Sequence, residues 1–306
     1  LFPFSLMSHD LEFTKPDLFR QPLAISSLQG NIDWRYIEDH WHLISDNLVL
    51  DTPVLKTRNR MHLKIPESLN MATAMFDFQS HFVDGDLPAL KAYWPVGVLD
   101  DDLVGWLDNA YVAGRIPQGD ALFYGVLKDF PFNHGDGLFE VQFNVEDVEL
   151  NYHEDWPNFA GFDAQIRYRN DNMTLFAKDW RLNGAQIVET YAELPSVEHS
   201  NHLSVRAKIK GKIQQTLGFL QQTPLKDLIA PVTELINVTG ENSIDIDMKI
   251  PLIAQASTTV DGVATLSKSQ LKILAADIDV KKLAGALSFN EQGVFTKQAI
   301  TGEALG

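Results

Sequence analysis

Cysteine is absent from the 306 residues, so neither a disulfide nor a thiolate metal site can form. Positive charge is also scarce, because 25 Lys and Arg stand against 41 Asp and Glu and the formal net charge is −16. The chain therefore has no basic excess to neutralise phosphates, which argues against nucleic-acid binding. The same charge disfavours electrostatic docking on an anionic membrane surface. Any contact with lipid should be apolar.

Long hydrophobic runs are missing as well. No stretch approaches the roughly 20 apolar residues of a spanning helix, and no signal-peptide pattern follows Leu1. We expect an internal piece of a longer protein whose membrane anchors lie outside it. Hydrophobic residues nevertheless make up 45% and charged residues 22% of the chain, which is typical of a folded body with a large core.

The common signatures of catalysis and cofactor binding do not occur, including GxGxxG, the P-loop, GxSxG and HExxH. We expect no enzyme activity, no cofactor and no metal site. His40 and His42 share one side of a strand, but no third ligand stands nearby in sequence. Asp100–Asp102 is expected to cap a helix, and Asp245 and Asp247 are expected to be solvated strand residues.

Strand patterns dominate, because apolar and polar residues alternate with period two. Turn residues at Asn170–Asn172 and Asn290–Gly293 predict hairpins between such runs. Glycines such as Gly30 and Gly262 are expected to open strands. Three alternating runs each give a strand with one apolar side: Phe139, Val141, Phe143 and Val145; Leu203, Val205 and Ile209; and Ile244, Ile246, Met248 and Ile250.

Helical patterns are few and short. One helix is predicted after Asp100–Asp102, with an apolar stripe that ends at Tyr111 and a stop at Gly114. A second is predicted near 213–237, where Thr223–Pro224 resembles a helix start and Pro231 should introduce a kink. These helices are too few to cover the dry faces of so many strands, which favours an open sheet.

The region between Tyr93 and Pro157 resembles the central domain of the YhdP branch of the AsmA-like family. Weaker likeness extends from Pro22 to Phe289 and so covers nearly the whole chain. The resemblance depends on these residues: Tyr93-Trp94-Pro95, Trp106-Leu107, Ala113-Gly114, Gly125, Phe130-Pro131-Phe132, Gly137-Leu138-Phe139, Tyr152 and Trp156-Pro157.

The resemblance implies a periplasmic protein anchored in the inner membrane, whose strands curl into a long, taco-like hydrophobic groove. Phospholipid acyl chains would be its partners and would contact the apolar sides of the three alternating runs, which makes those residues the candidate lipid-facing residues. Parts outside this segment would contact the inner and outer membranes. We expect one continuous segment with N-terminal strands over 1–86, a central region over 87–200 and a β region with the kinked helix over 201–306. The family pattern contributes no catalytic residue.

Two other interpretations remain open at this point. The same strands could form a closed β-sandwich, a structural or interaction protein of the cell envelope that carries no lipid. An enzyme acting on envelope glycans would need two converging carboxylates in a cleft, and it ranks last. The groove and the sandwich differ in whether the apolar strand faces are reachable from outside.

Overall fold

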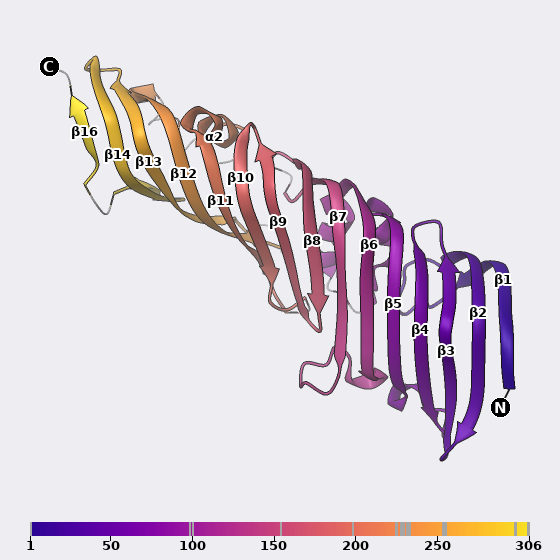
Figure 1. The fold of residues 1–306 in the computed structure, drawn as a ribbon. Helices are drawn as coiled ribbons and strands as arrows, with labels where there is room; N and C mark the ends of the chain where they lie inside the picture. Colours follow the sequence, from indigo (N-terminus) through magenta and orange to yellow (C-terminus); the bar gives the residue numbers. More distant parts are fainter. Residues whose placement is uncertain are drawn as a thin grey trace. The chain divides into compact units, whose positions relative to one another are not determined.

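The chain folds into one antiparallel sheet of sixteen strands. A computed structural model describes residues 2–97, 99, 101–153, 155–197, 199–223, 226, 230, 234–252, 256–296 and 299–304. The strands follow one another in sequence order from β1 to β15, and β16 pairs with β14. Figure 1 shows β1 to β6, and likewise β10 to β14, side by side in this order. The predicted fold class, mainly β with a few short helices, is confirmed.

The strands are long and most connections between them are short. The strand bounds are β1 Phe2–Phe13, β2 Leu23–Ile37, β3 His40–Asp51, β4 Lys56–Pro66, β5 Met75–Asp86, β6 Tyr111–Val126, β7 Leu138–Leu150, β8 Phe159–Arg169, β9 Asn172–Leu182, β10 Ala185–Leu194, β11 His202–Lys212, β12 Ile236–Pro251, β13 Thr259–Ile273, β14 Ile278–Asn290, β15 Gly293–Phe295 and β16 Thr301–Ala304. The helices whose bounds the structure describes are α1 Asp101–Ala110 and α2 Ile213–Leu220, with the short 3-10 helices η1 Met71–Thr73, η2 Pro88–Tyr93 and η3 Leu127–Asp129. Within the described part of the chain, no helix is long and apolar enough to cross a membrane.

The residues group into two compact units. Unit 1 comprises Leu1–Asp147, Ala164–Thr174 and Leu194–Ser200. Unit 2 comprises Val148–Asp163, Leu175–Glu193 and Asn201–Gly306. Both predicted turns are present, since Asn170–Asp171 joins β8 to β9 and Glu291–Gln292 joins β14 to β15.

Helix α1 corrects the expected helix end. It begins at Asp101, with Asp101 and Asp102 in its first turn. Asp100 lies outside the described residues. The helix stops at Ala110 rather than at Gly114, because Tyr111 already belongs to β6. Gly114 has a φ of 139° inside that strand and accepts a hydrogen bond from the Leu87 amide.

The second predicted helix is seen only in part. Helix α2 covers Ile213–Leu220, and its buried Ile213 packs with Leu266 and Leu283. The proline start and the kink fall on Pro224 and Pro231, which lie outside the described residues, as do Leu225, Leu228, Ile229 and Val232.

The expected strand-opening glycines are interior strand residues, so that prediction was wrong. Gly30 lies in the middle of β2, and Gly262 lies inside β13. A Cβ atom at Gly262 would stand 2.1 Å from the Phe289 ring on the neighbouring strand. The missing side chain admits a bulky neighbour across the ladder, which is a reason for glycine in strand interiors.

Phe132 closes the end of the sheet where β6 turns into β7. Its side chain is 1% exposed. A Cβ atom at either Gly125 or Gly137 would come within 2.4 Å of the Phe132 ring, so the ring occupies a notch left by two glycines. The Leu127 amide also donates to the Ala74 carbonyl (3.0 Å), which ties this connection to the start of β5.

Phe132→Ala should lower the free energy of unfolding of unit 1 by about 3–5 kcal/mol, because it leaves a cavity that two glycines cannot fill. The measurement is the midpoint of urea unfolding followed by tryptophan fluorescence. Phe130→Ala is the matched control, since Phe130 is 38% exposed and its loss should cost much less. Equal changes in the urea midpoint for the two variants would contradict the packing role of Phe132 between the two glycines.

Candidate functional site: the apolar sheet faces

In unit 1, one face of the sheet is apolar across four strands. Leu63 stands directly opposite Phe76, and Met61 opposite Phe78, on β4 and β5. Phe78 in turn stands opposite Phe123 on β6. Because directly opposed residues of antiparallel strands project to the same side, these side chains share one face. The unit 1 apolar face is defined by Met61, Leu63, Phe76, Phe78, Ala121, Phe123, Phe139, Val141 and Phe143.

Phe123 is the centre of this face. Its ring centroid lies 5.6 Å from Phe76, 6.0 Å from Phe139 and 5.1 Å from Phe132. These separations are within the favourable range for aromatic pairs. Phe139 also contacts Tyr168 on β8, with ring centroids 5.3 Å apart. The predicted β7 residues thus join a larger aromatic surface.

Glycine at position 119 leaves room for two large neighbouring side chains. An added Cβ atom there would stand 2.4 Å from the Phe82 ring and 2.5 Å from the Cβ atom of Phe143. The Phe82 and Phe143 rings are 6.2 Å apart between centroids. The small residue on β6 is therefore covered by its two neighbours, and it leaves no side chain of its own on the face.

Most apolar side chains of the unit 1 face are partly exposed, although Phe82 and the polar Ser80 and Asn59 on the same face are buried. Near one end Leu87, Leu103, Leu107 and Ile116 are buried beside α1 and η2, and near the other end Phe132 is buried. Between them, the side chains of Met61, Leu63, Phe76, Phe78, Phe123, Val141 and Phe143 are all partly exposed. All sixteen described strands belong to one sheet, so no second described sheet covers this middle strip.

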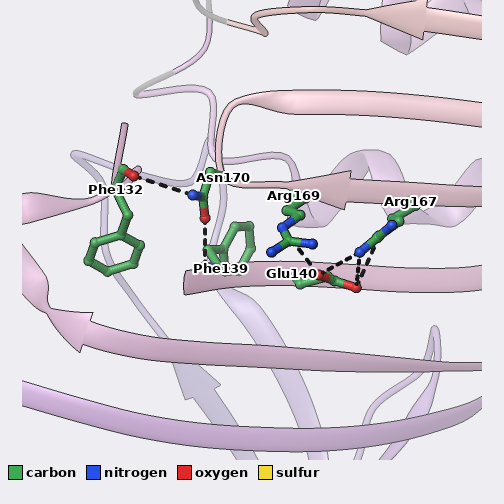
Figure 2. A network of polar contacts seen from close by, with 6 residues as sticks. All are labelled: Phe132, Phe139, Glu140, Arg167, Arg169 and Asn170. Atoms are coloured by element: carbon green, nitrogen blue, oxygen red, sulfur yellow. Dashed lines mark hydrogen bonds and ion pairs between the residues drawn. The ribbon is translucent and has the colours of Figure 1, made fainter. Parts of the chain in front are cut away.

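Asn170 fixes the end of the face at the β8–β9 turn. Its side-chain Nδ2 donates to the Phe132 carbonyl at 3.3 Å, and its Oδ1 accepts from the Phe139 amide at 3.0 Å. Its own amide donates to the Phe139 carbonyl at 2.8 Å. Figure 2 shows Asn170 between Phe132 and Phe139. One residue thus joins the turn, the start of β7 and the segment that carries Phe132.

The opposite face of the same strands is polar and ion-paired. Arg167 makes two 3.0 Å hydrogen bonds to the Glu140 carboxylate, and Arg169 lies 3.7 Å from it. Figure 2 shows both arginines directed at Glu140. Glu140 follows Phe139 in sequence, so the two sides of β7 differ completely in polarity, as period-two alternation requires.

Unit 2 has an apolar face of the same kind. Leu203 stands opposite Ile250, Val205 opposite Met248, and Ile209 opposite Ile244. The buried residues again lie toward the ends of the β12 run, because Ile244 is 4% and Ile250 3% exposed. Ile246 and Met248 between them are partly exposed. The unit 2 apolar face is defined by Leu203, Val205, Ala207, Ile209, Ile244, Ile246, Met248, Ile250 and Ala264.

An aromatic cluster accounts for Tyr152 and Trp156 of the motif region. The Tyr152 ring stacks on Phe159 at 4.5 Å, and Trp156 contacts Phe219 of α2 at 6.3 Å. Phe159 also contacts Trp180 at 5.6 Å. Burial raises the pKa of the Tyr152 hydroxyl well above its usual value, so the group stays neutral. These residues act in packing.

Ten of the eleven predicted lipid-facing residues belong to the apolar faces of the two units, and Val145 follows Phe143 on the same side of β7. Val145, Leu203, Val205, Ile244 and Ile250 are buried, whereas Phe139, Val141, Phe143, Ile209, Ile246 and Met248 are partly exposed. Sequence reasoning missed Phe76, Phe78 and Phe123. The first two alternate with Asp77 and Gln79, the same signal that identified β7, whereas Gly119, Ala121 and Gly125 interrupt the signal around Phe123.

The two histidines of β3 have different partners, and His42 pairs with His62 of β4. His42 Nδ1 lies 2.8 Å from His62 Nε2, and His40 Nδ1 lies 2.7 Å from the Glu38 carbonyl. Among the described residues, no group of three His, Asp or Glu side chains could hold a metal ion. Burial, followed by the nearby His62, Lys64 and His40, lowers the pKa of His42 below its usual value.

Comparison with known proteins gives one family. The sequence model of the family described as "YhdP protein" matches residues 1–306. The chain is 24% identical over 272 residues to an Escherichia coli (strain K12) protein named "Intermembrane phospholipid transporter YhdP". The match covers 89% of this chain and 21% of that protein, so the chain spans about a fifth of its relative's length. No solved structure matches.

Asn170→Gly should weaken the anchoring of Phe132 while it retains the positive φ of 52° at this turn. The loss of two side-chain hydrogen bonds should cost about 1–3 kcal/mol. Hydrogen exchange at the Phe139 amide should speed up, and exchange in the β4–β5 ladder should change less. An unchanged exchange rate at Phe139 would contradict the role of Asn170.

His42→Gln should reduce the loss of stability on acidification. Because the folded-state pKa of His42 is lowered, its contribution is complete above the unfolded value of about 6.5 and is lost as the pH falls below it. The measurement is the urea midpoint at pH 8 and at pH 5 for both proteins. The same pH difference in the variant as in the parent would contradict this assignment.

Proposed function

The chain belongs to the YhdP protein family, and we propose that it is a length of a conduit for phospholipid between membranes of the cell envelope. The observation that carries the proposal is the partly exposed apolar strip along the middle of each unit's sheet. A water-soluble domain normally covers a sheet face of this kind. The matched relative is named as an intermembrane phospholipid transporter.

Acyl chains fit the strip in chemistry and in size. Each methylene moved from water onto an apolar wall gains about 0.8 kcal/mol. Strands of twelve residues rise about 40 Å at roughly 3.3 Å per residue. The rings around Phe123 form a continuous wall. Gly119 and Gly125 have no side chains that would project between these rings. Tails would lie against this wall.

The polar face would be the outer side of the conduit and would contact the surrounding water. It carries the Glu140–Arg167 pair and similar exposed pairs such as Arg60–Asp46 and Lys56–Asp84. Each exposed pair contributes little stability, but together they keep the outer side wet. In this proposal the segment sits in the periplasm, and the parts of the protein outside it contact the inner and outer membranes.

A transport role needs no covalent chemistry from the chain. The two carboxylates that alternate with isoleucines on β12, Asp245 and Asp247, are exposed on the polar face. Asp247 lies 3.8 Å from Arg206 on β11. They project to the same side of one strand, next to cations of the neighbouring strand, which is the arrangement of solvated structural residues rather than of a catalytic pair.

The decisive experiment is photo-cross-linking in the intact protein in cells. A photoreactive residue at Phe143 should capture phospholipid, detected by labelled phosphate and mass spectrometry. The same residue at Gln142, its neighbour on the opposite face, should capture none. Ile246 and Asp245 supply an equivalent pair in unit 2.

The two outcomes separate the competing functions. Capture at the apolar members alone supports the conduit. Capture at neither member of either pair, in protein that is folded and expressed, would favour an interaction protein whose apolar faces are covered by other protein.

A further inference from the structure

Unit 2 has a hollow with an excess of positive charge, which is unusual in a chain of net charge −16. Its volume is about 490 Å³, within the roughly 300–1,000 Å³ typical of small-molecule sites. Three cations line it and one anion does. The lining side chains that carry the argument are Arg181, Lys210, Lys212, Gln186, Gln215 and Glu241.

The strand register gathers these side chains on the polar face. Lys210 stands opposite Gln186 on β10 and opposite Ser243 on β12. Lys212, two residues further along β11, stands opposite Glu241. Residues two apart on a strand project to the same side about 6.6–7 Å apart. Both lysines therefore line the same hollow.

The cations of the hollow are not neutralised by an ion pair within the described part of the chain. Among the described residues, neither Lys210 nor Lys212 has an ion pair through its side chain, whereas Lys208 on the same strand is paired with Glu189 at 3.1 Å. Arg181 uses one nitrogen, Nη1, to donate to the Gly184 carbonyl at 3.2 Å, which holds it beside the β9–β10 turn. Its other N–H donors have no partner among the described residues.

The amide of Gln215 completes the wall. Its Oε1 accepts from the Lys212 backbone amide at 2.9 Å, which leaves the Nε2 group as a donor beside Gly184. Three cationic side chains and an amide donor that converge on one space are suited to an anion with several oxygens. A carboxylate ligand would use fewer of these donors than a phosphate would.

The larger hollow of unit 1, about 920 Å³, offers a contrast. It also lies on a polar face, but Arg60 is paired with Asp46, and His81 with Asp120. Glu140 adds a further anion to its wall. Its charges compensate one another internally, so it has no comparable preference for an anion.

We propose that the hollow of unit 2 binds a phosphate group. The inference rests on the proposed function in one respect, because a phospholipid headgroup is the source of phosphate that a lipid conduit would encounter. A soluble phosphate has the same chemistry, so the test must separate the two sources. The site lies at the ends of β9 and β11, where a headgroup could extend beyond the sheet.

The test uses the whole chain and follows the backbone amide resonances of Gly184 and Gly211 by nitrogen-15 NMR. One arm titrates inorganic phosphate and the other dihexanoylphosphatidylglycerol below its micelle concentration, each against sodium chloride of equal ionic strength. The variant carries Lys210→Gln with Lys212→Gln. The matched control carries Lys249→Gln with Lys281→Gln, which removes two exposed lysines of the same unit outside the hollow.

Saturable shifts with the lipid that weaken at least about tenfold in the variant, and not in the control, support a headgroup site. Shifts with inorganic phosphate alone overturn the lipid as the source. Overturning the phosphate site itself requires no shift in either arm, or equal weakening in the control. Cross-linking at Phe143 tests the apolar face of unit 1. A negative NMR result would therefore reject the phosphate site without rejecting the proposed conduit.

Discussion

Period-two alternation is the constraint on which the structure depends. A β-strand presents successive side chains to opposite sides, so a chain made almost entirely of strands must place every second residue on a common face. Here that face is mostly apolar, and among the described residues the helices that could cover it are short and placed near its ends. The result is a sheet whose dry side is sealed at the ends and left partly exposed in the middle.

The sealing depends on a few close contacts. Phe132 occupies a notch left by Gly125 and Gly137, and Asn170 binds the segment that carries it. At the other end of unit 1, Arg20 contacts Asp108 of α1 at 2.7 Å, which fastens the helix to the β1–β2 connection. The polar face needs no such sealing, because water and ion pairs satisfy it. The contacts that stabilise the sheet therefore lie near the strand ends, whereas the exposed apolar strip lies along the strand middles.

Much of this could be read from the sequence. The alternating runs on β7, β11 and β12 were predicted with the correct sides, because their polar and apolar residues separate cleanly. Tertiary context decided the rest. Gly114 resembles a helix stop, yet the chain enters β6 at Tyr111, four residues before Arg115 pairs with Asp86 of β5. Phe123 was missed because the glycines beside it break the alternation, and their purpose appears only when the neighbouring rings are in place.

The order of the strands has a consequence for how the chain reaches its fold. From β1 to β15 each strand pairs with the one before it, so every ladder joins segments that are close in sequence. Ordering such a chain incurs little loop-closure entropy at each step. Strands can therefore be added one at a time as the polypeptide is synthesised, before the rest of the chain is present. A protein assembled in this way can be lengthened by duplicating hairpins without redesign of the part already folded.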